Sequence, residues 1–354
     1  MTFQPHDGDT APVPAGQGEP GRRQRRDDRP KNRGARIAVW TLVAIVGIAA
    51  VAAGAVLGRL ASGYEQAERL PQTEVFPEAE SRPDPIETPE EASNEPLNIL
   101  VLGSDTRGEV GDNMESIRGQ RSDTIMVVNI PADRESINIM SIMRDNWVEI
   151  PGRGMNKINA AMSFGGIPLT VQTIEGIIDV PIDHVAVIDF EGFKGLTDAV
   201  GGVTLNNPNS FSAGGTTFAQ GEITLQGEEA LTFVRERYAF AGGDYTRVAN
   251  QQLFMKALIS QVLSRDTLTS PTKIIDSVDA ISPYLTVDDG LGVTTLVPLG
   301  MSMSSLRGGD VNTFTSPTLG TGMVGSQSVV HPDWDRLAEL AVLFREDAVG
   351  TWVP

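Results

Sequence analysis

TIMVVNIPADRESINIMSIM, residues 124–143, contains two apolar runs rich in β-branched residues on either side of a short polar segment. Residues 124–130 and 136–143 have the length and composition of buried strands. The segment between them, Pro131-Ala132-Asp133-Arg134, contains the residue types that favour a turn. We therefore predict a β-hairpin here.

The chain on both sides of this hairpin mixes strands with helices. Periodicity predicts strands at 97–102, 182–190, 220–225 and 312–315. It predicts helices within 156–178, divided near Gly165–Pro168, and at 192–200, 227–234, 244–264, 273–280, 293–305 and 333–347. Because the alternation is not a strict βαβ rhythm, we predict an α/β fold with α+β character, in which helices flank both faces of a central mixed sheet.

Composition excludes several kinds of function. The 354 residues include 46 acidic and 28 basic side chains, for a formal charge of −18, and no cysteine. The absence of cysteine rules out disulfides, thiolate metal sites and a cysteine nucleophile. The net negative charge argues against nucleic acid as a partner, because phosphate contacts require a basic face.

The charge is unevenly distributed around an apolar segment. Residues 1–36 form a polar tail with eight basic and five acidic side chains, which we predict to be disordered and cytoplasmic. Residues 37–58 carry no charge and are long enough to cross a bilayer as a helix, so we predict a transmembrane signal anchor, with the folded part outside the cell membrane. The alternative is a signal peptide cleaved near Ala53-Gly54-Ala55, but the apolar run exceeds the usual length for one. Residues 59–96 are acidic and proline-rich, which predicts a spacer, with the folded domain at 97–350.

Familiar enzyme motifs are missing. The sequence has no Walker A motif, no H-E-x-x-H and no G-x-S-x-G, and its three histidines are His6, His184 and His331. Gly320, Gly322 and Gly325 match G-x-G-x-x-G formally, but no long strand precedes them and no helix follows, so we predict a glycine-rich loop.

Arginines and aspartates gather at the ends of the predicted elements. A single pair of this kind is an ordinary solvated cap, but a sheet can bring several strand ends into one crevice. Guanidinium groups bind phosphoryl oxygens in pairs, and carboxylates hold a hard cation such as Mg²⁺, so the mixture points to phosphate chemistry. The clusters lie at Ser104–Arg107, Arg121–Thr124, Arg144–Asp145, Arg235–Arg237 and Asp244–Gln251.

The helix predicted from Asp244 places three of these polar side chains on one face. Asp244, Arg247 and Gln251 share one face at its N-terminus, an end that favours anions. The same face continues with Phe254, Met255, Leu258 and Val262, which suits either an amphiphile or an ordinary core face. Arg235 and Arg237 reach a common site only if the preceding helix ends near Val234.

An ordered set of motifs resembles the LytR–CpsA–Psr family of membrane-anchored glycopolymer transferases. The resemblance covers roughly residues 97–265. Its parts are NILVLGSDTR (98–107), RSDTIMVVNI (121–130), SIMRD (141–145), KINAAMSFGG (157–166), the 189–203 stretch and ALTFVRERYAFAGGDYTRVANQQ (230–252).

The resemblance implies a phosphotransferase that moves a glycan from a polyprenyl-pyrophosphate carrier to peptidoglycan, at the outer face of the membrane, with Mg²⁺. It implies metal carboxylates at Asp105 and Asp123 and catalytic roles for Arg144, Arg235, Arg237 and Asp244. The implied pyrophosphate-binding set is Arg121, Arg144, Arg235, Arg237, Arg247 and Gln251.

Two departures from the family pattern and two alternative functions remain. Met143 stands where the family commonly has proline, and the segment 108–120 is long. The alternatives are a non-catalytic lipid- or glycan-binding regulator, such as a transcription attenuator, and a hydrolase that uses water as the acceptor of the phosphoryl group.

Overall fold

A computed structural model describes residues 58–86, 94–104, 124–264 and 270–354. A seven-stranded mixed sheet is central to these residues, with strand order β1-β12-β7-β2-β3-β4-β13. The predicted hairpin is confirmed: β3 and β4 pair antiparallel, and β2 lies antiparallel to β3 on its other side. The strands are β1 (Glu68–Leu70), β2 (Leu97–Ser104), β3 (Thr124–Ile130), β4 (Ile137–Ile142), β7 (His184–Asp189), β12 (Leu285–Asp288) and β13 (Val311–Thr315).

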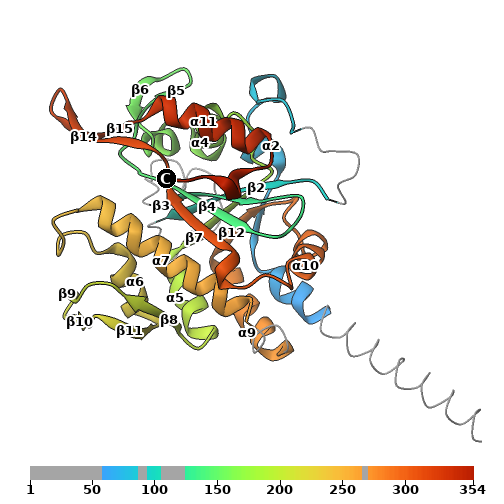
Figure 1. Ribbon diagram of the computed structural model, residues 1–354. Coiled ribbons are helices and arrows are strands. Elements are labelled where there is room, and N and C mark those ends of the chain that lie inside the picture. Colours follow the sequence, from blue (N-terminus) through green and yellow to red (C-terminus); the bar gives the residue numbers. More distant parts are fainter. Residues whose placement is uncertain (1–57, 87–93, 105–123, 265–269) are drawn as a thin grey trace, which may run out of the picture. The chain divides into compact units, whose positions relative to one another are not determined.

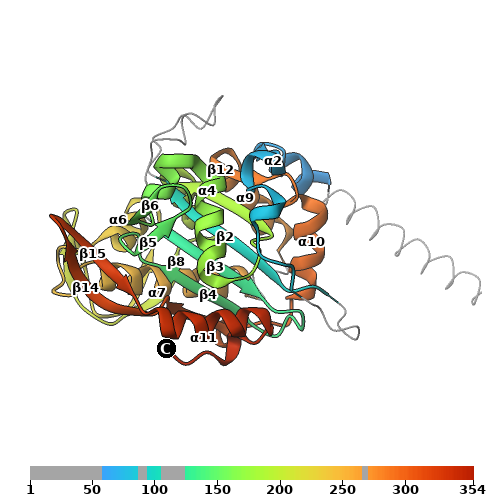
Figure 2. The same ribbon diagram turned by 90° about the horizontal axis from the view of Figure 1, so that it is seen from above.

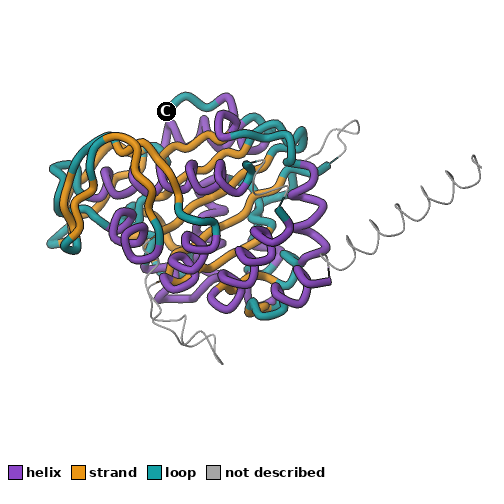
Figure 3. Tube along the Cα trace, turned by 90° about the horizontal axis from the view of Figure 1, so that it is seen from below, coloured by secondary structure: helices purple, strands orange, loops and turns teal. Residues whose placement is uncertain are grey.

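Helices cover both faces of this sheet, as predicted (Figure 1). One face carries α2 (Gln72–Val75), α4 (Ala160–Ile178) and α11 (Trp334–Arg345), which Figure 2 shows from above. The other carries α5 (Phe190–Ala199), α6 (Gly227–Arg235), α7 (Asp244–Val262), α9 (Pro271–Ile281) and α10 (Val293–Ser302). Figure 3, seen from below, shows this second layer lying across the strands.

Burial on both faces explains the unbroken apolar runs of the central strands. Ile125 and Val127 of β3 point into the core beneath α4 and α11, and Met126 packs on the opposite face with the α7 residue Ile259. Residues after 270 complete the sheet through β13, predicted at 312–315, and through β12, which the sequence analysis did not predict.

Short ribbons and turns connect these layers. Four two-stranded ribbons pair β5 (Trp147–Ile150) with β6 (Gly154–Lys157), β8 (Val203–Asn207) with β11 (Gly221–Leu225), β9 (Phe211–Ala213) with β10 (Thr216–Phe218), and β14 (Thr318–Val324) with β15 (Gln327–Pro332). Single 3₁₀ turns are η1 (Ala79–Ser81), η2 (Ser282–Tyr284), η3 (Gly308–Asp310) and η4 (Val349–Thr351). The predicted division of the 156–178 helix is a kink at Gly166, where φ is 68°.

The prediction of a spacer at 59–96 is wrong for much of that segment. β1 is an edge strand of the main sheet, paired in parallel with β12, and Val75 is buried in the core. Arg82 Nη2 lies 2.6 Å from the buried Oε1 of Glu175 in α4. The prolines flank these short elements without interrupting them, so the segment folds onto a surface supplied by residues distant in sequence. The folded unit therefore begins well before Leu97.

The prediction of a glycine-rich loop at 320–325 is also wrong. Gly320 and Gly322 lie within β14, which pairs with β15 across a turn at Gly325. Gly322 permits close approach, because a Cβ there would lie 2.5 Å from Nε2 of His331. Glycine removes the apolar alternation by which a strand is recognised in sequence.

The predicted tail and anchor lie outside the described residues, apart from Gly58. Among residues 58–86, 94–104, 124–264 and 270–354, no helix has both the length and the apolar character needed to span a bilayer.

Candidate active site

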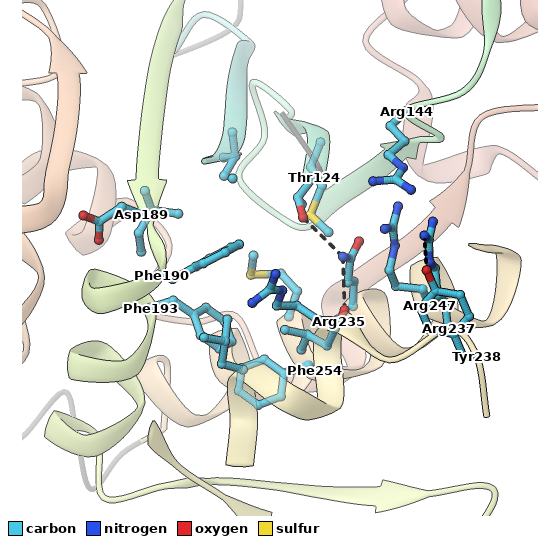
Figure 4. Close-up of a pocket in the computed structure, with 18 residues that line it drawn as sticks. Thr124, Arg144, Asp189, Phe190, Phe193, Arg235, Arg237, Tyr238, Arg247 and Phe254 are labelled. Atoms are coloured by element: carbon cyan, nitrogen blue, oxygen red, sulfur yellow. Dashed lines mark hydrogen bonds between the residues drawn. The ribbon is translucent and has the colours of Figure 1, made fainter. Parts of the chain in front are cut away.

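A cavity of about 290 Å³ lies between the sheet and the helices α5, α6 and α7. The ends of β2 and β7, the start of β3 and the residues that follow β4 and α6 all reach it (Figure 4). This is the crevice that the clustering of charged residues at strand ends predicted. Its lining is Val101, Gly103, Thr124, Met126, Arg144, Ile188, Asp189, Phe190, Phe193, Leu231, Val234, Arg235, Arg237, Tyr238, Arg247, Gln251, Phe254 and Met255.

The two ends of the cavity differ in chemistry. Phe190, Phe193 and Phe254 gather at one end, where Phe193 and Phe254 have ring centroids 5.2 Å apart. Arginines from three different segments gather at the other, with Arg144 and Arg247 pointing toward each other and Arg237 beside them (Figure 4). The cavity therefore has an apolar end and a cationic end.

Arg144 is positioned by the residue before it. Met143 is fully buried and packs with Val248 of α7 and Val330 of β15, which ties the end of β4 to both elements. The flexible methionine fills the junction of β4, α7 and β15. Arg144 remains largely buried, with its Nε 3.9 Å from Oδ2 of Asp145.

Arg247 is held by the first turn of α7. Its Nη2 lies 2.8 Å from Oδ1 of Asp244, and only 5% of the residue is exposed. Gly243, with φ of 51°, is the N-cap, and Asp244 is the first helical residue. Asp244 does not itself line the cavity. It orients the guanidinium that does.

Arg235 and Arg237 both reach the cavity because α6 ends at Arg235, one residue beyond the predicted position. The backbone becomes extended at Glu236, whose Oε1 accepts hydrogen bonds from the amides of Tyr238 and Ala239 and fixes the turn. The Arg235 guanidinium lies 4.3 Å from the centroid of Phe190. Arg237 lies over Tyr238, 4.6 Å from the ring centroid.

Gln251 joins two walls of the cavity. Its Nε2 donates to Oγ1 of Thr124 and to the carbonyl oxygen of Val234, both at 3.2 Å. The Gln251 side chain therefore connects β3 to α6. Direct pyrophosphate binding by Gln251 stays a prediction.

The apolar face of α7 divides between two roles. Phe254 and Met255 line the cavity, whereas Leu258 is buried in the core between α7 and the β8–β11 region. Val262 packs at the edge of the same core. One half of the stripe therefore lines the cavity and the other half is a core face, and binding of an amphiphile stays a prediction.

Three aromatic residues of the lining were given no role in the sequence analysis. Phe190, Phe193 and Tyr238 lie within stretches quoted for the resemblance, but their residue type alone does not distinguish a cavity wall from a core. Asp189 also lines the cavity, but its Oδ1 accepts from the amide of Gly192 and caps α5. Burial raises the pKa of Asp189, and Figure 4 shows its carboxylate pointing away from the arginines. We assign it a structural role.

Three predicted site residues, Asp105, Arg121 and Asp123, lie outside the described residues. Their described chain neighbours are informative, because Gly103 of β2 and Thr124 of β3 are register partners and both line the cavity. In the part of the chain that the structure describes, no three His, Asp or Glu side chains cluster closely enough to hold a metal ion.

Comparison with known proteins places these observations in a family. The model of the LytR_cpsA_psr family matches residues 65–341. A polyisoprenyl-teichoic acid–peptidoglycan teichoic acid transferase TagU from Bacillus mycoides is 39% identical over 194 residues, which are 54% of this chain and 61% of the relative. A TagU of Enterococcus faecalis is 38% identical over 56% of this chain and 64% of the relative. The match thus spans about three fifths of the length of these curated relatives.

Solved structures show the same fold. B. subtilis TagV has a TM-score of 0.61 at 28% identity, over 74% of this chain and all of that chain. TagT bound to LI-WTA has a TM-score of 0.59 at 23% identity, over 77% of this chain and 99% of that one, a likeness of fold alone.

Proposed function

The chain belongs to the LytR–CpsA–Psr family, and on this premise we propose that it transfers a glycopolymer from a polyprenyl-pyrophosphate carrier to peptidoglycan. The observation that carries this proposal is the single cavity with aromatic rings at one end and arginines at the other. A hydrocarbon chain and a diphosphate joined in one molecule require this combination. The names of the relatives, which are teichoic acid transferases, support the same reaction class.

The arginine end binds the diphosphate. Arg144, Arg237 and Arg247 stay charged at any physiological pH and present paired N–H donors that match phosphoryl oxygens. The N-terminus of α7 adds the positive end of a helix of nineteen residues. In a chain with a net charge of −18, this local cluster is what admits an anion.

The aromatic end holds the first part of the polyprenyl chain. The rings of Phe190, Phe193 and Phe254 offer an apolar surface. Replacing the water on this surface by hydrocarbon lowers the free energy by about 25 cal/mol for each Å² buried. Arg235, stacked on Phe190, stands between the rings and the diphosphate.

The reaction is a displacement at phosphorus. A hydroxyl of peptidoglycan attacks the phosphorus that carries the glycan, and polyprenyl phosphate leaves with the bridging oxygen. The arginines stabilise the charge that moves onto the leaving phosphate, an effect worth 10²–10³ in rate for one well-placed donor. Gln251 and Asp244 hold the walls and Arg247 in place.

Magnesium is part of this proposal through the donor set. Asp105 directly follows β2 and Asp123 directly precedes β3, and the described ends of these strands pair at the cavity. Two carboxylates from these positions suit a hard cation. Such a cation would neutralise part of the negative charge of a diphosphate bound at the arginine end. Mg²⁺ there would withdraw charge from the phosphoryl oxygens. Arg121 would join the diphosphate-binding set from the same segment.

We propose further that the chain is a single-pass protein of the cell membrane with a cytoplasmic N-terminus. The uncharged segment 37–58 and the basic residues before it support this topology. It would place the cavity on the side of the membrane where peptidoglycan lies.

A transfer assay tests the proposed function. The full chain in detergent is mixed with a radiolabelled polyprenyl-pyrophosphate oligosaccharide, Mg²⁺ and nascent glycan strands, and we expect label to appear on the strands through a phosphodiester. Arg237→Ala is expected to lower kcat/KM by at least about 10²-fold. Arg345→Ala, which removes an arginine paired with Asp179 outside the cavity, is the matched control and is expected to change it less than twofold. Transfer that persists in Arg237→Ala would contradict the assignment.

A further inference from the structure

A second cavity, of about 460 Å³, adjoins the first on the far side of its arginines. Arg144 and Arg237 line both cavities and so form the shared wall between them. The other lining residues come from the turn after β4, the end of β6, the start of α4 and the start of β15: Asp145, Asn156, Lys157, Asn159, Ala160, Ser163, Phe164 and Gln327.

Backbone hydrogen bonds connect several of the segments that line this cavity. The amides of Ile158 and Asn159 donate to the carbonyl oxygens of Asn146 and Arg144, at 2.8 and 3.2 Å. The amide of Val330 donates to the carbonyl oxygen of Asp145 at 2.9 Å, which fixes β15 to the same turn. The turn after β4 is therefore bonded both to the segment between β6 and α4 and to β15.

Apart from the shared Arg144 and Arg237, the lining differs from that of a lipid or an anion site. Lys157 Nζ lies 2.9 Å from Oδ1 of Asp145, so the pair contributes no net charge. The amides of Asn156, Asn159 and Gln327 offer donors and acceptors together. Phe164, 41% exposed, presents an aromatic ring at the edge. Neutral donors and acceptors beside an aromatic ring match a saccharide, whose hydroxyls both donate and accept and whose C–H faces pack on rings.

The direction of attack at phosphorus indicates whether a sugar in this cavity would belong to the donor or to the acceptor. In phosphoryl transfer the attacking and leaving oxygens lie roughly in line on opposite sides of phosphorus. If the leaving polyprenyl phosphate occupies the apolar cavity, the attacking hydroxyl must approach from the other side of the arginine wall, where the polar cavity lies.

We propose that the polar cavity is the acceptor site, in which a peptidoglycan sugar presents its hydroxyl to the phosphorus beside Arg144 and Arg237. This inference rests on the proposed function. Asp145 accepts a hydrogen bond from the hydroxyl and orients it. A new bond forms between the sugar oxygen and phosphorus, the bond from phosphorus to the bridging oxygen breaks, and the electron pair leaves with polyprenyl phosphate. The hydroxyl proton is released to water through the open cavity.

The test separates the two substrates kinetically. Phe164→Ala and Gln327→Ala are made in the full chain, because both side chains are exposed. We expect the KM for a peptidoglycan acceptor to rise about tenfold in Phe164→Ala and severalfold in Gln327→Ala, while the KM for the lipid-linked donor changes less than twofold. Trp334→Ala removes an equally exposed aromatic ring that lines neither cavity and is the control.

A binding measurement makes the result independent of turnover. Saturation-transfer NMR with a synthetic peptidoglycan tetrasaccharide is expected to show contact with the wild-type chain and its loss in Phe164→Ala. A raised donor KM with an unchanged acceptor KM would assign the cavity to the donor's glycan and overturn the inference. Transfer with no effect of either variant would overturn it while leaving the proposed function intact. Tetrasaccharide binding that needs Phe164 in a chain that transfers nothing would support the sugar site and contradict the transfer function.

Discussion

The four described arginines of the cavity stand in different surroundings. Arg247 is 5% exposed and paired with Asp244, whereas Arg237 is partly exposed and rests on Tyr238, a residue 83% exposed. A buried ion pair costs several kcal/mol to break from one side, because the remaining charge stays desolvated. Removing a guanidinium near solvent leaves no desolvated partner charge. Replacing Arg247 and replacing Arg237 should therefore destabilise the fold by different amounts.

We predict that Arg247→Ala and Arg237→Ala both lose transfer activity but differ in stability. Arg247→Ala should lower the free energy of unfolding by about 3 kcal/mol, because it leaves the Asp244 carboxylate buried without this partner. Arg237→Ala should lower it by less than about 0.5 kcal/mol. Urea unfolding of both variants, followed by tryptophan fluorescence, measures the difference. Equal midpoints would show that the Arg247–Asp244 pair does not stabilise the fold.

At this scale the sequence identified charged residues better than apolar ones. Arg144, Arg235, Arg237 and Arg247 were found because charged side chains at the ends of apolar runs form a visible pattern, and all four line one cavity. Phe190 and Phe193 were not found, because an aromatic residue at the start of a helix has the same pattern whether it faces a ligand or a core.

At the scale of elements, a row of asparagines connects four adjacent strands at the end of the sheet away from the arginines. Nδ2 of Asn129 in β3 donates to Oδ1 of Asn98 in β2 at 3.0 Å, and Nδ2 of Asn138 in β4 donates to Oδ1 of Asn129 at 3.0 Å. Asn312 in β13 donates to Asn138 at 2.9 Å. Asn98, Asn129 and Asn138 are each 1% exposed, so these bonds replace water entirely.

Removing the middle of this row should destabilise the sheet without changing the site. Asn129→Ala leaves a buried acceptor on Asn98 and a buried donor on Asn138, and we expect a loss of about 2 kcal/mol in the free energy of unfolding. Activity per folded molecule should be unchanged. Thr204→Ala, which removes an exposed cross-strand hydroxyl pair with Thr224, is the control and should cost less than about 0.5 kcal/mol. A similar loss in both variants, seen by thermal denaturation, would contradict the role given to the row.

Strands were predicted correctly where both of their faces are buried, and were missed where their own residues lack an apolar pattern. The predicted bounds of β3 are those observed, because both faces of that strand are apolar. β1 was missed because three residues in an acidic, proline-rich segment carry no strand pattern, and only the edge of β12 gives them a partner. β14 was missed because its glycines remove the alternation of apolar and polar residues. Its pairing with β15 in the structure is what identifies it as a strand.

At the scale of the whole molecule, stability should depend on pH through Asp183. This carboxyl precedes β7, accepts the amide of Asn98 at 2.7 Å, and has its pKa raised to about 6, chiefly by burial. Since the pKa in the folded state lies above the ordinary value of 3.8, the carboxyl's contribution to stability is complete below about pH 4 and is lost as the pH rises through 6.

Asp183→Asn keeps an acceptor for the Asn98 amide and removes the titration. Between pH 4 and 7 the wild-type free energy of unfolding should therefore fall by about 1–3 kcal/mol more than that of the variant. Chemical denaturation at several pH values measures both curves. Parallel curves through this window would show that Asp183 does not titrate near 6 in the folded protein.

The distribution of charge across the molecule could be read only in part from the sequence. The count of −18 predicted that polyanions are excluded from the surface at large. That arginines from β4, α6 and α7 would meet at one cavity followed from the resemblance and from the placement of strand ends, and the cavity confirms it. The polar cavity beyond them was not predicted, although two motifs of the resemblance, SIMRD (141–145) and KINAAMSFGG (157–166), supply most of its lining.

The central claim is that one cavity holds a diphosphate at its arginines and a hydrocarbon chain on its aromatic rings. Isothermal titration of the full chain with inorganic pyrophosphate, isopentenyl pyrophosphate and geranyl pyrophosphate, in Mg²⁺ buffer, tests it most directly. We predict that affinity rises at least about tenfold from pyrophosphate to geranyl pyrophosphate. Phe254→Ala should reduce this gain, and Arg237→Ala should weaken all three ligands alike. Equal affinity for the three ligands, or a gain with chain length that persists in Phe254→Ala, would contradict the claim.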